Sequence, residues 1–479
     1  MKISKIYKYH TIKNNHLITK ITNNSKEVID GSIFVAINGY SENGEKYIDE
    51  AIKKGALTII VRKDFNLEKY NKLDINFIKV SNPKKELAIL FKKIYGDFLT
   101  NFKIIGITGT SGKTTCCTLL YKYLRTLNLN TICFTSNGNF INDNYLVTVN
   151  TTPNISIIYN TIINSNIKKG YIIIEISSQA ISELRVLGIP FDIIGITNIT
   201  SDHLDYHKNV TDYFYTKSRL IYQLKEEGNL ILNHDSKYFN KLESFTINPV
   251  YSFGSNINSD FLLELVESKD YKTLFLITCK DQIVPLETSL IGKFNIENIT
   301  LVFGILNILN LNLDNFSNFI KNISPVDGRM NIYKIHKRTI IIDYAHTSNA
   351  VESALKTIKE LYKQNIKLII GCGGNRDHLK RPIIGKLSCK YADFVYFTED
   401  NSRNESLSKI LKEITCDLTT HNYMIIESRM NAIKKAVMDS KENDVIVLMG
   451  KGCENTLVEN TNYTDLEMIK KCFQELKGE

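Results

Sequence analysis

Residues 104–115 read Ile-Ile-Gly-Ile-Thr-Gly-Thr-Ser-Gly-Lys-Thr-Thr, an apolar run that ends in a glycine-rich turn and is followed by an amphipathic stretch. The apolar part predicts a buried parallel strand, Gly109 and Gly112 form the turn, and the periodicity after them predicts a helix. A strand, a glycine turn and a helix N-terminus together direct backbone N–H groups at an anion. Lys113 adds a charge for terminal phosphates, and the Thr114 hydroxyl suits a magnesium ion. We therefore predict a phosphate-binding loop; the alternative is a turn that only joins a strand to a helix.

The composition fits a multidomain enzyme. The chain has 479 residues, 43% of them hydrophobic, and this length predicts roughly three domains. No apolar run reaches membrane-spanning length, and residues 1–13 are too polar for a signal peptide. Nine scattered cysteines without metal-type spacing predict a reducing cytoplasm. The net charge of +9 suits a polyanionic small substrate or serves solubility alone, and the absence of a dense basic patch argues against nucleic-acid binding.

The pattern of strands predicts an α/β fold in three sections. The central section holds the phosphate-binding loop on a parallel sheet, and its strands are apolar throughout, as parallel strands covered on both faces should be. The last section repeats strand–loop–helix units and predicts a doubly wound, Rossmann-like sheet. The predicted domains are residues 1–101, 102–327 and 328–479. A helix is predicted over residues 84–95, and strands over residues 32–37, 57–61, 76–80, 104–107, 171–176, 193–197, 338–342, 367–370, 394–397 and 444–449.

Charged residues stand where two central strands end, which is where open α/β sheets bind ligands. Glu175 closes the apolar strand over 171–176, and a carboxylate there is costly unless a cation pairs with it. A magnesium ion near the phosphate-binding loop would fit, and a salt bridge to a lysine is the alternative. The next strand leads to Asp-His-Leu-Asp-Tyr-His at 202–207, whose four titratable groups predict either a metal or acid–base site or an ordinary polar loop.

Glycine or charge also follows four strands of the last section. The segments are Asp-Tyr-Ala-His-Thr (343–347), Gly-Cys-Gly-Gly-Asn-Arg-Asp (371–377), Asp-Asn-Ser-Arg (400–403) and Gly-Lys-Gly-Cys-Glu (450–454). A single glycine after a strand is usually only a turn. Several such segments on neighbouring strands of one sheet predict a cleft that holds a zwitterionic or anionic ligand.

In their order along the chain, these segments resemble the motifs of the Mur ligases, and the resemblance covers nearly the whole chain. The motifs in the last section narrow it to the members that add the third amino acid. The other matching motifs are Asn-Ser-Lys (24–26), Gly-Ser-Ile-Phe-Val-Ala (31–36), Asn-Thr-Thr-Pro (150–153), Glu-Ile-Ser-Ser (175–178), Gly-Lys-Phe-Asn-Ile-Glu-Asn (292–298) and Asp-Gly-Arg-Met (327–330).

The resemblance implies a cytoplasmic, ATP- and magnesium-dependent ligase of peptidoglycan synthesis. Such enzymes transfer the γ-phosphoryl group of ATP to the carboxylate of UDP-N-acetylmuramoyl-L-alanyl-D-glutamate. The amine of an amino acid then displaces phosphate from the acyl phosphate. Lys113 and magnesium would screen the repulsion between the two anions that must meet. We expect a monomer without a nucleic-acid partner or a membrane span.

The resemblance also implies roles for individual residues. The implied catalytic residues are Lys113, Glu175, His203 and Lys217. Magnesium would be held by Thr114, Glu175, His203 and Lys217, the last as the carbamate N6-carboxylysine. ATP would be bound by Gly109, Thr110, Ser111, Gly112, Lys113, Thr114, Thr115, Asn295, Asn298, Arg329 and His346. In the UDP-dipeptide, the uridine would be bound by Ser25, Tyr40, Ser41 and Glu42. The muramoyl-dipeptide would be bound by Asn150, Thr151, Thr152, Ser177, Glu183 and Arg185. For Lys217 a plain solvated helix lysine is the alternative.

For the amino acid we predict meso-diaminopimelate. Its far end carries a second carboxylate, and an arginine suits such a group best. Diaminopimelate-adding relatives have Asp-Asn-Pro-Arg in the loop at 400–403, whereas lysine-adding ones typically lack the arginine. Arg403 is therefore the discriminating residue, unless it only caps the helix near Leu407 or pairs with Glu405. The implied contacts are Arg376, Asp400, Asn401, Ser402, Arg403, Gly450 and Glu454.

Some positions depart from the family pattern. They put the uridine and dipeptide contacts in most doubt. Three alternatives therefore stay open: the same reaction with L-lysine, a ligase like folylpolyglutamate synthetase, and an inactive nucleotide-binding scaffold. The departing positions are Asn24, Lys26, Gln179, Glu183, Ser402 and Cys453.

Overall fold

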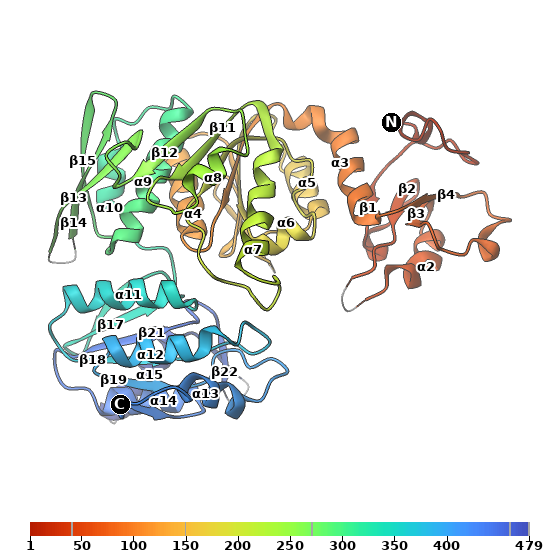
Figure 1. Cartoon of the computed structure of the whole chain (residues 1–479). Coiled ribbons are helices and arrows are strands. Elements are labelled where there is room, and N and C mark those ends of the chain that lie inside the picture. The colour runs from red at the N-terminus through yellow and green to blue at the C-terminus, as the bar shows by residue number, and fades with distance from the viewer. Residues whose placement is uncertain (40–41, 149, 270–271, 459–460, 478–479) are drawn as a thin grey trace. The chain divides into compact units, whose positions relative to one another are not determined.

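The structure, a computed structural model, describes residues 1–39, 42–148, 150–269, 272–458 and 461–477 (Figure 1). The chain divides into two compact units, which we describe separately. Unit 1 comprises residues 1–106, 124–194 and 219–228, and unit 2 comprises residues 107–123, 195–218 and 229–479. Both units combine helices with largely parallel sheets, so the predicted α/β class is confirmed. The three domain boundaries stay predictions.

Unit 1 begins with a small parallel sheet of order β1-β2-β3-β4. The helix after it, α3, starts where the sequence provides a cap, because the Asn82 side chain accepts from the Lys85 N–H and Pro83 is the first helical residue. Phe91 of α3 stacks on Tyr159 of α5 with ring centroids 4.9 Å apart. The four strands are β1 (Ile21–Thr22), β2 (Ser32–Val35), β3 (Ala56–Arg62) and β4 (Asn76–Val80).

The largest sheet has the strand order β15-β14-β13-β12-β11-β10-β5-β9-β6-β7-β8. Strands β5, β10 and β11 contribute residues to both units. The antiparallel strands β13 to β15 and β7 to β8 were not predicted from the sequence. The eleven strands are β5 (Phe102–Thr108), β6 (Thr131–Thr135), β7 (Gly138–Ile141), β8 (Asn144–Leu146), β9 (Gly170–Ile176), β10 (Phe191–Ile196), β11 (Leu224–Asn233), β12 (Val250–Gly254), β13 (Phe261–Lys269), β14 (Lys272–Cys279) and β15 (Gln282–Thr288).

The last sheet, in unit 2, has the order β16-β17-β21-β18-β19-β20. All its neighbouring pairs are parallel except β16 with β17. Strand β21, the last of the six in the sequence, lies between β17 and β18, so the loops after β17, β21, β18 and β19 leave one edge, as predicted. The strands are β16 (Asn331–Ile335), β17 (Arg338–Asp343), β18 (Ile366–Ile370), β19 (Phe394–Phe397), β20 (Tyr423–Ile425) and β21 (Val445–Met449).

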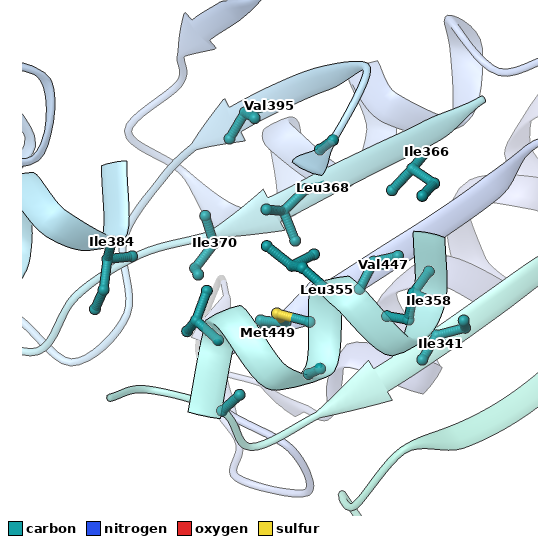
Figure 2. Packing of buried hydrophobic residues seen from close by; sticks show 14 of the residues in the cluster. Ile341, Leu355, Ile358, Ile366, Leu368, Ile370, Ile384, Val395, Val447 and Met449 are labelled. Atoms are coloured by element: carbon teal, nitrogen blue, oxygen red, sulfur yellow. The ribbon is translucent and has the colours of Figure 1, made fainter. Parts of the chain in front are cut away.

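Both faces of this sheet are buried, which explains why its strands are continuous apolar runs. Successive side chains of a strand point to opposite faces. Leu368 and Ile370 therefore pack with Leu355 of α11 in one cluster (Figure 2), while Ile369 packs with Ile433 of α14 in another. The helices on the first face are α11 (Ser348–Leu361), α12 (Lys380–Tyr391) and α13 (Leu407–Thr415), and those on the second are α14 (Arg429–Met438) and α15 (Asp465–Lys477).

The predicted strands lie within two residues of observed strand ends. Each of the nine cysteines is a free thiol. Throughout the part of the chain that the structure describes, no helix combines the length and the apolar character needed to cross a membrane. The remaining helices and strands are α1 (Ile3–Ile6), α2 (Ile48–Lys53), α3 (Pro83–Leu99), α4 (Lys113–Thr126), α5 (Ile155–Asn164), α6 (Ser178–Ser182), α7 (Val210–Ser218), α8 (Phe239–Glu243), α9 (Lys293–Ile308), α10 (Phe316–Asn322), β22 (Thr456–Val458) and β23 (Thr461–Tyr463).

Candidate active site

The glycine-rich loop connects β5 to α4, and two of its positions require glycine. Gly109 and Gly112 have φ values of +148° and +85°, which residues with a Cβ rarely adopt. A Cβ at Gly109 would lie 1.8 Å from the hydroxyl oxygen of Thr197, and one at Gly112 would lie 2.3 Å from the side-chain oxygen of Asn298. The backbone N–H groups of residues 110 and 111 are held by Asn198, at 2.8 and 3.0 Å. The glycine spacing thus allows close packing on residues far away in the sequence.

Two lysine ammonium groups lie against carbonyl oxygens of this loop. Lys113 Nζ donates to the carbonyls of Gly109 and Thr110 at 3.1 and 2.8 Å. Lys217 of α7 is only 1% exposed, and its Nζ donates to the Gly109 carbonyl at 2.7 Å. This Nζ also lies 4.8 Å from the ring centroid of Tyr213. The interpretation of Lys217 as a solvated helix lysine is therefore wrong, because its charge is buried at the loop.

Arg329 and His346 both contact Tyr344, a residue that the sequence did not single out. Arg329 Nη2 donates to the Thr114 hydroxyl oxygen at 3.3 Å, and Arg329 Cζ lies 4.2 Å from the Tyr344 ring centroid. The His346 ring meets the Tyr344 ring edge-on, with centroids 4.9 Å apart. His346 Nδ1 lies 2.9 Å from the Tyr344 carbonyl oxygen, which can only accept, so Nδ1 carries the proton. Tyr344 thus contacts both Arg329 and His346, two of the residues that are implied to hold ATP.

Asp202 and His203 form a hydrogen-bonded pair after β10. Asp202 accepts from the His203 backbone N–H at 2.8 Å, and its other carboxylate oxygen lies 3.2 Å from His203 Nε2. Burial lowers the pKa of His203 to about 4 although Asp202 opposes the shift, and the charges of Lys113 and Lys217 add to the effect of burial. Burial likewise lowers the pKa of His346 to about 4. Both imidazoles are therefore neutral near neutral pH, the form in which histidine binds metals.

The four titratable groups of residues 202–207 do not form a single cluster. Asp205 carboxylate lies 3.5 Å from Nη1 of Arg376. His207 is only 2% exposed, and its Nδ1 lies 3.6 Å from the carboxylate of Asp212. The motif therefore serves three places: Asp202 and His203 pair with each other, Asp205 pairs with Arg376 of the last section, and His207 is buried.

Asn295 and Asn298, both 5% exposed, lie in the first two turns of α9 and are committed to protein contacts. Asn295 Nδ2 donates to the Ile291 carbonyl at 2.8 Å. Asn298 lies against Gly112 and accepts a hydrogen bond from the Cys116 thiol at 3.4 Å. Asn298 therefore packs against the glycine-rich loop, whereas Asn295 binds the segment just before its own helix.

Hydrogen bonds join the loops that follow β17, β18, β19 and β21. The Gly374 N–H donates to the Asn401 carbonyl at 2.7 Å, and Arg403 Nη1 donates to the Gly374 carbonyl at 2.7 Å. Asn401 Nδ2 donates to one Glu454 oxygen at 3.2 Å, and the Tyr344 hydroxyl donates to the other at 2.9 Å. The structure thus brings together the residues that the sequence placed in one cleft. Asp400 joins them, since a Cβ at Gly450 would lie 3.1 Å from its carboxylate.

The two structural alternatives for Arg403 are wrong. The Glu405 carboxylate pairs with Arg381 instead, at 2.8 Å. Helix α13 begins at Leu407 without a side-chain hydrogen bond at its N-cap. Within the described residues Arg403 has no carboxylate partner, and its Nη1 donates to two backbone carbonyls, that of Gly374 at 2.7 Å and that of Asn401 at 3.5 Å. Arg403 is exposed and has a φ of +50°, a conformation that turns the loop backbone sharply.

Five of the residues implied to hold the muramoyl-dipeptide form a network in unit 1. Thr152 Oγ1 donates to the Glu175 carbonyl at 2.7 Å and accepts from the Ser177 N–H at 3.0 Å. Arg185 donates to the Thr152 carbonyl at 2.9 Å and pairs with Glu183 at 2.7 Å. The other Glu183 oxygen accepts from Gln179 at 3.1 Å. Thr151 accepts from the Ser136 hydroxyl at 3.1 Å. Asn150, which directly precedes Thr151, is exposed.

Glu175 and Ser25 also have partners in unit 1 that the sequence did not indicate. Glu175 is 1% exposed and accepts from both the N–H and the hydroxyl of Ser136, at 2.9 and 3.1 Å. Ser25 donates to Glu50 at 2.7 Å, and Glu50 pairs with Lys54. Glu42 is exposed. The predicted uridine contacts Tyr40 and Ser41 lie outside the described residues.

Comparison with known proteins decides the family. The model of the Mur ligase middle domain matches residues 107–306, and that of the Mur ligase glutamate ligase domain matches residues 328–452. The chain is 32% identical over 484 aligned positions to a UDP-N-acetylmuramoyl-L-alanyl-D-glutamate–2,6-diaminopimelate ligase of Clostridium botulinum, covering 99% of both chains. The chain belongs to the Mur ligase family. An enzyme of the same name from Clostridium tetani is also 32% identical to this Mur ligase and is covered completely.

Solved structures agree with this Mur ligase in fold. A UDP-N-acetylmuramoyl-L-alanyl-D-glutamate–2,6-diaminopimelate ligase superposes with a TM-score of 0.69 at 22% identity, with 100% of this chain and 99% of the other covered. A MurF ligase from Thermotoga maritima in complex with ADP gives 0.67 at 18% identity, with 95% and 97% covered. A folylpolyglutamate synthase from the same organism gives 0.56 and covers 76% of this Mur ligase and 90% of that chain. The fold of folylpolyglutamate synthetases thus extends over less of the chain.

Proposed function

We propose that this Mur ligase joins meso-diaminopimelate to the D-glutamate of UDP-N-acetylmuramoyl-L-alanyl-D-glutamate, with ATP as the co-substrate. Membership in the family supports ligation and ATP use, and the names of the relatives at 32% identity support the substrates. We further propose that the enzyme acts as a cytoplasmic monomer. The three domains would be residues 1–101 for UDP, 102–327 for ATP and 328–479 for the amino acid.

In the proposed reaction a carboxylate is activated before an amide forms. A carboxylate oxygen of the D-glutamate attacks the γ-phosphorus of ATP, and ADP leaves. The amine then attacks the acyl carbon, phosphate leaves, and the amine loses a proton. Lys113 and Arg329 would lie near the phosphates, because Lys113 rests on the loop carbonyls and Arg329 donates to Thr114. Two cations at this position would stabilise the charge that develops as the phosphoryl group transfers.

Magnesium fits the donor groups that the proposal assigns to it. The Thr114 hydroxyl and the Glu175 carboxylate are buried oxygen donors, at 5% and 1% exposure, and magnesium prefers oxygen ligands. His203 is held in its neutral form by burial, which lowers its pKa. When bound, magnesium would neutralise charge on the phosphate oxygens.

Lys217 would contribute to that site as a carbamate. The Lys217 ammonium first loses one proton; carbon dioxide then adds to the neutral amine, an N–C bond forms and a second proton leaves, so that a cation becomes a carbamate anion. The carbamate nitrogen keeps one N–H, which can still donate to the Gly109 carbonyl that Lys217 contacts at 2.7 Å. The existing position of the side chain is therefore compatible with the modification.

The choice of diaminopimelate rests on one observation: the Arg403 guanidinium is fixed at the strand-end loops but has no carboxylate partner within the described residues. The second carboxylate of diaminopimelate would supply that partner. Glu454, held by Asn401 and Tyr344, would receive an ammonium group. L-lysine lacks the second carboxylate and would leave Arg403 unpaired, so it is the weaker candidate.

Product formation tests the proposal directly. The enzyme is incubated with ATP, magnesium, the UDP-dipeptide and either meso-diaminopimelate or L-lysine, and the products are separated and identified by mass. We expect the diaminopimelate product and phosphate release that requires all three substrates. Equal or better use of L-lysine would refute the choice of amino acid. Nucleotide binding without turnover with any amino acid would identify an inactive scaffold instead.

A further inference from the structure

Arg381, in the first turn of α12, has no exposed surface, and acceptors surround its guanidinium. Nη1 donates to Glu405 at 2.9 Å and to Glu413 at 2.6 Å. Nη2 donates to the other Glu405 oxygen at 2.8 Å and to the Gly373 carbonyl at 3.0 Å. The ring nitrogen Nδ1 of His378 lies 3.0 Å from Nη1. A single side chain thus connects α12, α13 and the two loops after β18 and β19.

His378, Glu405 and Glu413 resemble a metal site, but the arginine already fills it. Among the described residues they are the group of three histidine, cysteine or acidic side chains whose ligand atoms lie close enough together to hold an ion. The Arg381 guanidinium lies within hydrogen-bond distance of a ligand atom of each. The charge that these groups balance is that of the Arg381 guanidinium, and we assign no metal to them.

Glu405, which binds Arg381, also forms a hydrogen bond to the loop after β18. Its Oε2 also accepts from the Asn375 N–H at 2.9 Å, and the Asn375 side chain accepts from the Asn404 N–H at 3.1 Å. With the two hydrogen bonds of Gly374 described above, these contacts fasten residues 371–377 to residues 400–406.

The two fastened loops carry the two cations of the proposed amino-acid site. Arg376 belongs to the first loop and Arg403 to the second. Because Arg403 also donates to Gly374 of the first loop, a shift of either loop changes the distance between the two guanidinium groups. The buried contact between Arg381 and Glu405 is hydrogen-bonded to the first loop at both Gly373 and Asn375.

Stability alone does not account for this arrangement. Arg381 Nε is buried and finds no hydrogen-bond partner among the residues that the structure describes, and burying a charge pair generally stabilises a protein no better than apolar packing does. The fold nevertheless brings Glu413 of α13, and Glu405 just before that helix, close enough to supply both carboxylates. Gly385 of α12 makes this possible, since a Cβ there would lie 2.1 Å from the Ile414 carbonyl oxygen. Ile384, which is labelled in Figure 2, and Ile414 belong to the same buried cluster.

We propose that Arg381 is a positioning residue that, through Glu405, sets the distance between Arg376 and Arg403 and thereby the choice of amino acid. It does not touch the substrate, because it is fully buried. The inference rests on the proposed function in one respect, the assignment of the two arginines to the amino acid.

Two variants of the full-length enzyme test it. Arg381→Lys keeps the charge but loses the forked donor, and Glu405→Gln keeps the shape but loses the charge. For each we expect the KM for meso-diaminopimelate to rise about tenfold or more, because small displacements of positioned groups are costly. The KM values for ATP and the UDP-dipeptide should stay near those of the parent. Hydrogen exchange should accelerate in residues 371–377 and 400–406.

Arg338→Lys is the matched control. Arg338 also connects two segments, because it joins β17 to the connection between α14 and β21 by hydrogen bonds of 2.7 and 2.8 Å to Ser440, but at the opposite end of β17 from the loops. Its KM for diaminopimelate should match the parent value.

The outcomes separate the two proposals. A fall in kcat with an unchanged KM for diaminopimelate, in a parent enzyme that uses this amino acid, would overturn the positioning role alone. If the parent enzyme uses another amino acid, the proposal of diaminopimelate as the substrate is refuted. The positioning role is then tested by the KM for that other amino acid, which should rise in both variants. If Arg381→Lys does not fold, Glu405→Gln decides.

Discussion

Lys217 Nζ lies 2.7 Å from the carbonyl oxygen of Gly109, so helix α7 is hydrogen-bonded to the first residue of the glycine-rich loop. Lys113 donates to the same carbonyl at 3.1 Å. Two cations that share one acceptor repel each other across a partly buried site. Conversion of Lys217 to a carbamate would turn that repulsion into attraction, which gives the modification a local electrostatic advantage.

Lys217→Ala should therefore abolish most activity, and bicarbonate should not restore it. We expect a loss of about a hundredfold or more, the size seen when one preorganised electrostatic group is removed. Phosphate release with all three substrates present measures it. Lys208→Ala removes an exposed lysine just before the same helix and should leave the rate unchanged. Full activity of Lys217→Ala would refute the role, and isotopically labelled bicarbonate offers a direct test for the carbamate in the parent enzyme.

Lys113→Ala should reduce phosphate release by about a hundredfold to a thousandfold, because it removes a positioned cation from the site of phosphoryl transfer. The free energy of unfolding should change little, since the Lys113 ammonium is only partly buried. Lys122→Ala, further along α4, is the matched control and should turn over like the parent. Near-parental phosphate release by Lys113→Ala would contradict the assignment of this loop.

Arg403→Ala should impair the use of diaminopimelate far more than that of L-lysine. A hydrogen bond to a charged group contributes about 1.5 to 3 kcal/mol, which corresponds to roughly tenfold to a hundredfold in kcat/KM. Competition between the two amino acids in one reaction measures the preference. Lys412→Ala removes an exposed cation from α13 and should preserve it. An equal decrease in kcat/KM with both amino acids would show that Arg403 does not bind the second carboxylate of diaminopimelate.

The low pKa of His346 predicts how stability depends on pH. Burial lowers this pKa from 6.5 to about 4, so between these values the unfolded chain binds a proton that the folded chain does not. The free energy of unfolding should therefore fall as the pH falls through this window, by up to about 1.4 kcal/mol per pH unit from this one group. Urea unfolding at several pH values measures the slope. His346→Gln should have a shallower slope than the parent, whereas His421→Gln, at an exposed position, should keep the parental one.

Local pattern was enough to predict the parallel strands and the loops at their ends. Buried parallel strands such as β18 are short apolar runs, and their carboxyl ends collect at one edge, which made the neighbourhood of residues 371–377 and 400–403 predictable. The antiparallel strands β13 to β15 were missed although β14 alternates between exposed and buried residues, the usual sign of a strand with one covered face.

The contacts that hold the site in place could not be predicted in this way. Arg381 meets Glu405 across 24 residues of sequence, and nothing local marks either residue. Tyr344 lay inside a recognised motif, yet its contacts to Arg329 and Glu454 depend on the packing of separate loops. Gln179 and Glu183 both depart from the family pattern, and the structure relates the two departures because the Gln179 side chain donates a hydrogen bond to Glu183.

The position of β21 has a consequence for how the protein is made. Strand β17 carries the loop with His346, and β18 and β19 carry the loops with Arg376 and Arg403, but β17 pairs with β21 and not with β18. Until Val445 and the residues after it have been synthesised, the two halves of this sheet have no strand between them. A nascent or prematurely terminated chain therefore lacks the strand that aligns the loop with His346 to the loops with Arg376 and Arg403. The strand of this sheet that leaves the ribosome last is thus a central one, so the sheet is completed only after its other five strands have been made.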